Sequence, residues 1–215
     1  MLKKKFDNNK IGLTAKELSV LKKLDTPQKI QDFISAIPQN FEPNGDSCMS
    51  VREVLRTNRA HCIEGALVAA LALWVHGEAP LILDMTASSE DFDHVIAVFK
   101  RDGYWGALSK GNHAVVRYRD PVYRTLRELM MSYFHEYYNL VGAKTLRSYS
   151  SPVDMRRYKP ETWITGVDAW PIAEDLDRVK HWKLLTLPQE RRLQPIDALA
   201  TKAGTIVQYK KLKAQ

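Results

Sequence analysis

The chain has 215 residues, of which 45% are hydrophobic and 27% are charged, and its formal net charge is +7 at pH 7. These values are typical of a globular chain with material for one sizeable core, so we expect residues 1–215 to form a single domain. The longest apolar run, Ala66 to Val75, is about half of the roughly 20 residues that cross a bilayer, which argues against a membrane-spanning protein.

The cysteines, the opening segment and the basic residues narrow the class of protein further. The two cysteines, Cys48 and Cys62, form no Cys-x-x-Cys pair, which argues against a disulfide scaffold and a cysteine-rich zinc site. Polar sequence follows Met1 to Phe6 where a secretory signal would have an apolar core, so we expect a reduced, cytoplasmic chain. The basic residues are scattered and not interleaved with aromatic residues, and we expect neither a nucleic-acid nor a membrane partner.

Three helix starts are marked in the first 60 residues. Thr14 and Glu17 have the spacing of a capping box, and Ser50 and Glu53 repeat it ahead of a short helix. Thr26-Pro27 is typical of an N-cap followed by proline in the first turn, which predicts a helix that ends at Pro38. The N-terminal part is therefore expected to be helical.

The middle of the chain predicts a buried helix followed by strands. Ala60 to Gly77 is apolar all round, as in a helix covered on every side. Pro80 to Met85 and His94 to Phe99 are apolar and β-branched, which favours strands. The dipeptide Asp102-Gly103 then predicts a two-residue hairpin turn into a third strand, Tyr104 to Ser109.

The rest of the chain is less regular. Apolar residues from Pro121 to Tyr138 fall at helical spacing and predict one helix. Beyond Gly142, repeated prolines punctuate the sequence, and we expect short helices that pack on the main body as a lid or extension. The expected division is a core over about 26–140 and a C-terminal extension over about 141–215.

Cys62 is the candidate nucleophile because it heads the buried helix. A helix N-terminus carries roughly half a positive charge and unpaired N–H groups, which stabilise a thiolate and can bind an oxyanion. His94, at the start of a strand, is the candidate base. The alternative is that Cys62 is only a small apolar residue of the core.

A longer pattern supports the first interpretation. Arg59 to Ala66 contains Cys62 and runs into the hydrophobic helix, Phe92-Asp-His94 begins a strand, and Trp105 follows His94 by eleven residues. This combination, within about residues 26–109, resembles the transglutaminase-like superfamily of cysteine enzymes. The resemblance implies an α+β fold with a papain-like core, in which a central helix packs on a small antiparallel sheet, with additional N- and C-terminal helices. It also implies that Cys62 is the nucleophile, His94 the general base and Trp105 the aromatic residue before the acid.

The third catalytic position departs from that family. Its members usually have Asp fifteen residues beyond the histidine, where this chain has Ser109. A hairpin that turns on Asp102-Gly103 pairs residues whose numbers sum to 205, which sets Ser109 opposite Ile96 and diagonal to His94. A serine hydroxyl can orient the imidazole by accepting its N–H, but it cannot stabilise an imidazolium as a carboxylate does.

Other polar residues compete for roles at this site. Glu64 is a candidate substrate-binding residue together with Trp105, and its alternative role is to complement the helix N-terminus. Asp84, Asp91 and Asp93 lie near the strand ends and are expected to be solvated. A metal site built on His61 and His94 lacks an evident fourth ligand, so we expect no metal and no cofactor.

These residues predict a cysteine enzyme that acts on an amide or acyl group of a peptide, a protein or a small substrate. Hydrolysis is favoured over transamidation on the resemblance alone. The alternative is a catalytically silent member of the same fold that serves as a binding or scaffold module, an alternative that Ser109 favours.

Overall fold

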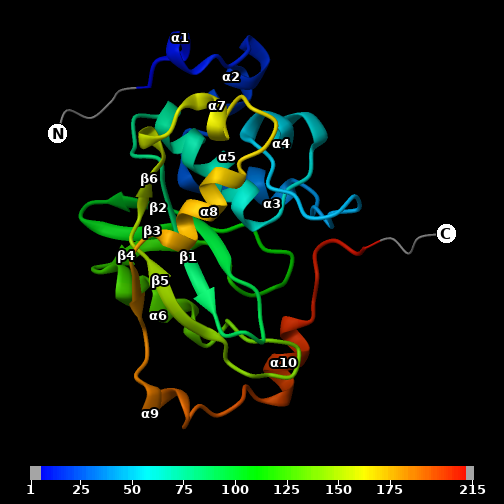
Figure 1. Ribbon diagram of the computed structural model, residues 1–215, viewed down its shortest axis with the longest axis vertical. Helices are drawn as coiled ribbons and strands as arrows, with labels where there is room; N and C mark the ends of the chain where they lie inside the picture. The colour runs from blue at the N-terminus through cyan, green and yellow to red at the C-terminus, as the bar shows by residue number, and fades with distance from the viewer. Residues whose placement is uncertain (1–5, 212–215) are drawn as a thin grey trace.

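The computed structural model describes residues 6–211 and shows a mixed α+β protein with one antiparallel sheet (Figure 1). The basic cluster Lys3–Lys5 and most of the opening segment, on which the export expectation depends, lie outside these residues. Among the residues described, no helix is both long enough and apolar enough to cross a membrane.

Three of the four N-terminal helices begin at the predicted caps. Their bounds are α1 Asn8–Ile11, α2 Ala15–Lys22, α3 Pro27–Ala36 and α4 Val51–Thr57. The Thr14 and Thr26 hydroxyls accept hydrogen bonds from the backbone N–H groups of Glu17 and Lys29, respectively. In return, the Glu17 carboxylate accepts the Thr14 N–H. Three of these four helices were thus predicted from capping chemistry.

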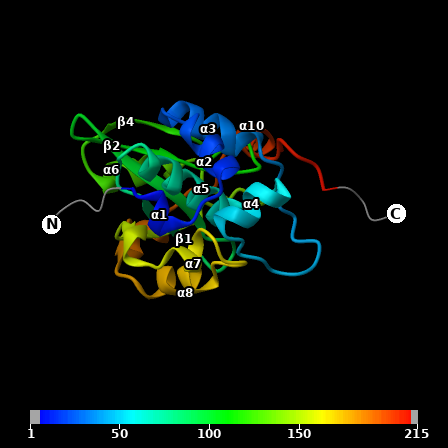
Figure 2. The same cartoon turned by 90° about the horizontal axis from the view of Figure 1, so that it is seen from above.

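The buried helix α5, Cys62–Val75, is the centre of the main core. Its residues from Ile63 to Trp74 are all buried. In Figure 2 it lies between α3 on one side and the helices α7, Pro160–Trp163, and α8, Trp170–Arg178, on the other. Trp74 stacks on Trp163 with ring centroids 6.4 Å apart, so the C-terminal part of the chain closes the core around α5.

The sheet has seven strands in the order β4-β3-β2-β1-β5-β7, with β6 also paired to β1. Their bounds are β1 Leu81–Ala87, β2 His94–Arg101, β3 Tyr104–Leu108, β4 Arg119–Tyr123, β5 Leu146–Ser150, β6 Val153–Asp154 and β7 His181–Lys183. Alternate residues of β2 face opposite sides: Val95 and Ala97 pack on the α5 core, whereas Ile96 and Val98 pack in a second core with α6, Leu126–Phe134.

The β2–β3 hairpin has the predicted register. Asp102 and Gly103 both have positive φ, as a two-residue turn of this kind requires, and Lys100 pairs with Trp105. Ala97 pairs with Leu108, so the paired numbers sum to 205 as expected. Strand β3 ends at Leu108, and by the same sum the next residue, Ser109, corresponds to Ile96 on β2.

Two predictions for the second half of the chain are wrong. The helix expected from Pro121 begins only at Leu126, because Thr125 caps it by accepting the Glu128 N–H. Pro121 lies instead in β4, at the edge of the sheet, where a missing N–H is tolerated and where Val122 is exposed.

The expected helical extension also differs from the structure. It contains α7, α8, α9 Leu187–Glu190 and α10 Ala198–Gly204, together with a short 3-10 helix at Met155–Arg157. It also supplies β5 and β6, which both pair with β1, and β7, which pairs with β5. The sheet is therefore larger than predicted, and the C-terminal third is part of it.

Candidate active site

Cys62 is the first residue of α5 and its side chain is partly exposed. It lies on the wall of a cavity of about 900 Å³, where His61 and His94 also reach the surface. The remaining helix is buried, so the fold brings the chemically reactive end of α5 to solvent. A cavity of this size is within the range of small-molecule and peptide sites.

Two histidines act on the Cys62 sulfur. Burial opposes ionisation of the thiol, but hydrogen bonds with His61 and His94 outweigh it and hold the Cys62 pKa well below its usual value. Cys48, by contrast, is enclosed in the core, and burial together with the nearby Glu64 charge raises its pKa to about 12. These opposite pKa shifts predict that Cys62 reacts more readily than Cys48.

Ser109 is hydrogen-bonded to His94 across the hairpin. The Ser109 hydroxyl oxygen is 2.9 Å from His94 Nε2, and the same hydroxyl donates its single proton to the Val116 carbonyl at 2.7 Å. It must therefore accept from His94, which places a hydrogen on Nε2 and leaves Nδ1 as the other ring nitrogen. The predicted diagonal contact is confirmed.

Ser109 is fixed by α3 and by the close approach of the following residue to α5. Its backbone N–H donates to Gln31 Oε1 at 2.9 Å, and the Gln31 amide donates back to the Ser109 carbonyl at 2.8 Å. A Cβ on Gly65 would lie 2.4 Å from the Lys110 Cβ. Only glycine allows the chain after Ser109 to cross the first turn of α5 at this distance.

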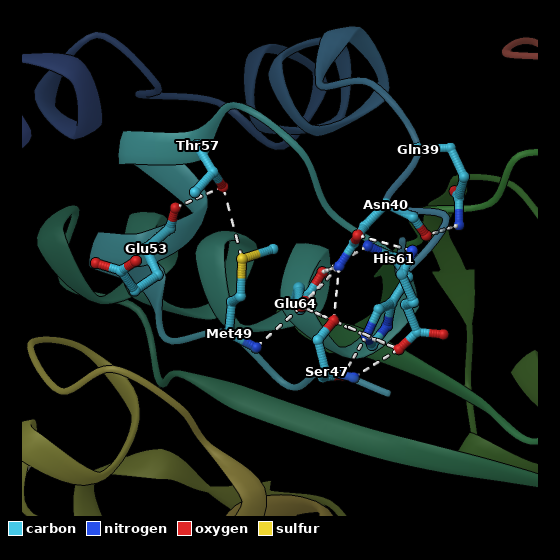
Figure 3. A network of polar contacts seen from close by, with 9 residues as sticks. Gln39, Asn40, Ser47, Met49, Glu53, Thr57, His61 and Glu64 are labelled. Atoms are coloured by element: carbon cyan, nitrogen blue, oxygen red, sulfur yellow. Dashed lines mark hydrogen bonds and ion pairs between the residues drawn. The ribbon is translucent and has the colours of Figure 1, made fainter. Parts of the chain in front are cut away.

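Beneath the cavity is a network of polar contacts around Glu64 (Figure 3). Glu64 is fully buried, and its Oε2 accepts the His61 backbone N–H at 2.8 Å. Its Oε1 accepts the Met49 N–H at 2.9 Å, and the Asn40 amide lies 3.1–3.2 Å from both oxygens. Glu64 caps α5, as its alternative role predicted, and it is not among the residues that line the cavity.

Three exposed apolar side chains line the cavity. Phe92, Leu140 and Val141 are 89%, 76% and 82% exposed, and all three line the cavity. They come from the β1–β2 and α6–β5 connections, which the topology brings to the edge where Cys62 lies. Gly204, at the end of α10, and Thr205, which follows it, also line the cavity.

Trp105 lies elsewhere. It pairs with Lys100 on β2 and with Tyr123 on β4, and the Lys100 ammonium is 5.2 Å from its ring centroid. The indole does not line the cavity, so the structure does not bring this candidate together with Cys62, His94 and Ser109.

Each of the three aspartates lines at least one of two cavities. Asp84 is buried, and its Oδ2 lies 3.2 Å from His181 Nε2, in a second cavity of about 170 Å³ that Asp93 also lines. Burial raises the pKa of Asp84 to about 6. Asp91 accepts the Thr145 hydroxyl at 2.6 Å and lines the larger cavity. The expectation that all three are solvated is therefore wrong for Asp84.

His61 was considered in the sequence only as a metal ligand, and its role beside Cys62 was missed. The available signal was its position immediately before the cysteine, where an N-cap side chain can turn back over the helix start. Within residues 6–211 no cluster of three or more His, Cys, Asp or Glu side chains is arranged to hold a metal ion. The chain matches no protein-family model and no curated protein.

Proposed function

We propose that this protein is a thiol-dependent amide hydrolase with a transglutaminase-like, papain-like core. The observations that support the proposal are the position of Cys62 at the N-terminus of a buried helix, its place with His94 on the wall of one cavity, and the hydrogen bond between His94 and Ser109. A thiolate at a helix N-terminus with an imidazole in contact is the arrangement that nucleophilic cysteine chemistry requires.

The reaction would proceed in two balanced steps. The Cys62 proton passes to His94, the thiolate attacks the amide carbonyl carbon, and the resulting oxyanion collapses as the C–N bond breaks. The proton on His94 leaves with the amine, and a thioester on Cys62 remains. Water then attacks the thioester, His94 takes its proton, and the acid product leaves as Cys62 is regenerated.

Backbone groups are available for the oxyanion. The first-turn N–H groups of a helix have no partner four residues back, and those of Cys62 and Ile63 are in this class. A carbonyl oxygen bound there would develop negative charge at the positive end of α5. The nucleophile and the electrophilic donors therefore come from the same helix start.

The cavity favours a peptide or protein as the acyl donor. Its volume of about 900 Å³ exceeds the needs of a single small acyl group. The exposed Phe92, Leu140 and Val141 side chains would cover an apolar residue of the substrate. Such burial contributes about 25 cal/mol for each Å² of apolar surface removed from water.

A second candidate function follows from Ser109. A serine stabilises an imidazolium less than a carboxylate does, so the same fold could serve as a binding module with Cys62 as a packing residue. The lowered Cys62 pKa favours the enzyme, because ordinary burial without the two histidines would raise it.

The test is hydrolysis of a panel of short peptide amides that release a fluorescent amine, with apolar and charged residues next to the amide. We expect turnover by the wild-type chain, loss of turnover in Cys62→Ala, and a fall of roughly a hundredfold to ten-thousandfold in His94→Gln. Cys48→Ala is the matched control and should retain turnover. Equal rates in the wild-type chain and Cys62→Ala would exclude the hydrolase.

A further inference from the structure

The His61 ring is surrounded by groups that accept hydrogen bonds. Its Nε2 lies 2.8 Å from the Ser47 carbonyl oxygen, 3.4 Å from Glu64 Oε1 and 3.7 Å from Glu42 Oε1. His61 directly precedes Cys62 in the chain, and both residues line the same cavity. Because a carbonyl oxygen only accepts, Nε2 must carry a hydrogen. Two carboxylates and a thiolate beside the same ring favour its charged form.

Glu64 is the buried carboxylate behind this ring. Its side chain is completely inaccessible, and Asn40, Met49 and the His61 backbone all donate to it, as the dashed lines of Figure 3 show. Donors on both oxygens correspond to the ionised carboxylate. Among the described residues, the ion pair recorded for Glu64 is with His61. A buried carboxylate needs such a counter-charge, since burial of an unpaired charge is costly.

We propose that His61, held by Glu64, carries a standing positive charge beside Cys62 that stabilises the thiolate, while His94 performs the proton transfers. Glu64 is then the positioning residue, and it supplies through His61 the negative charge that the third catalytic position lacks. The assignment to His94 rests on the proposed function, whereas the pairing of His61 with the thiolate needs no substrate.

The electrostatics of both partners agree with this arrangement. Burial disfavours the charged ring, but the Cys62 sulfur, Glu64 and the Ser47 carbonyl outweigh it and raise the His61 pKa to about 9. The titratable groups around His61 are Cys62, Glu42 and Glu64. Those that interact with the Cys62 charge are His61, His94, Cys48, Asp93 and Tyr137. Of the groups in these sets, only the two histidines can carry a positive charge beside the sulfur.

The contacts of Ser109 fit the same division of roles. The Ser109 hydroxyl accepts from His94 and donates to Val116, so it orients His94 without adding a negative charge. His94 is thus free to take up and release a proton during the reaction. A permanent partner for the thiolate would have to be the other imidazole.

The test is titration of the thiolate by its ultraviolet absorbance, together with the rate of iodoacetamide alkylation, in the full-length chain with Cys62→Ser as the blank. His61→Gln keeps the backbone N–H that Glu64 accepts, so α5 retains its cap. We expect this variant to titrate at higher pH than the wild type, with alkylation at neutral pH slowed about tenfold or more.

The matched control is His76→Gln, the same substitution at the other end of α5, where the ring bonds to the Leu21 carbonyl. It should leave the midpoint unchanged. Glu64→Gln should shift the midpoint in the same direction as His61→Gln, and Glu64→Asp should restore part of it. If Glu64→Gln fails to fold, the thiolate midpoint of His61→Gln still tests the proposal.

An His61→Gln midpoint equal to that of the wild type and of His76→Gln would overturn the proposal. The outcome is independent of the hydrolase test because alkylation needs no substrate. A chain that hydrolyses no amide but shows the His61-dependent shift loses the proposed function and keeps this inference. A chain that hydrolyses amides with an unshifted His61→Gln variant does the reverse.

Discussion

His94 and Ser109 meet diagonally across the β2–β3 hairpin, with His94 Nε2 2.9 Å from the Ser109 hydroxyl oxygen. The contact depends on the two-residue turn at Asp102-Gly103, because a one-residue change of register would turn one of the two side chains to the opposite face of the sheet. Gln31 adds two hydrogen bonds to the Ser109 backbone. The orientation of His94 is therefore a product of the fold.

Removal of the Ser109 hydroxyl should slow the reaction without abolishing it. Ser109→Ala leaves the His94 N–H and the Val116 carbonyl unpaired, and a hydrogen bond of this kind contributes about 0.5–1.5 kcal/mol. We expect kcat to fall by about two- to tenfold in the peptide amide assay. Ser150→Ala, a buried serine that accepts the Asp84 N–H on another strand, is the control. An unchanged kcat in Ser109→Ala would show that the hydroxyl does not orient His94.

The two cysteines should differ in reactivity. Cys62 is partly exposed with a lowered pKa, whereas burial raises the pKa of Cys48 to about 12. Alkylation followed by peptide mass spectrometry should label Cys62 with a midpoint below the value of about 8.5 for a free thiol. Cys48 should stay unlabelled in the folded chain and react after denaturation. Faster labelling of Cys48 in the native chain would contradict the account.

The buried Asp84 should make stability depend on pH. Because its pKa rises from 3.8 in the unfolded chain to about 6 in the fold, the folded state binds more protons between these values. This contribution to stability is present below pH 3.8 and is lost as pH rises through about 6, at a cost of up to about 3 kcal/mol.

Urea unfolding of the wild type and Asp84→Asn at several pH values tests this dependence. Groups that titrate equally in both chains cancel in the difference. The free energy of unfolding of the wild type should decline relative to Asp84→Asn across this range. Parallel curves would mean that Asp84 titrates as it does in the unfolded chain.

Gly65 should tolerate no side chain. A Cβ there would lie 2.4 Å from the Lys110 Cβ, so Gly65→Ala must displace the segment that follows Ser109. Overpacking of this kind costs about 1–3 kcal/mol, and we expect a lower Tm together with reduced turnover. The control is Gly77→Ala, whose Cβ meets nothing within 4 Å and whose cost arises only from its positive φ. Equal turnover in Gly65→Ala and the wild type would show that the close approach is not needed.

The elements predicted best from the sequence are those defined by local chemistry. The caps at Thr14 and Thr26, the all-apolar helix and the Asp102-Gly103 turn each act within a few residues, and the structure contains all of them. The strands β5, β6 and β7 were missed because each has only two to five residues and is stabilised by pairing with distant partners. Pro121 was placed in a helix because an edge strand with apolar residues can imitate helical spacing.

The site was predicted in part for the same reason. The contact between His94 and Ser109 could be predicted because the two-residue turn fixes the register of the hairpin locally. The Glu64 network was not predictable, because Asn40 and Met49 reach α5 from a loop whose path depends on the whole core. The role of His61 was not predictable either, because the fold and not the local sequence brings Ser47 and Glu42 beside its ring.

We expect Cys62 to form a covalent acyl-enzyme during turnover. The acyl group can be detected in the intact mass of the chain, acid-quenched during turnover of an activated peptide ester, and located by mapping of the modified peptide. We predict that the mass increases by one acyl group located on Cys62, and that the adduct is absent in Cys62→Ala. The adduct should decay more slowly in His94→Gln, because this variant lacks the base for water. Ester turnover with no acyl group on Cys62 would contradict the account.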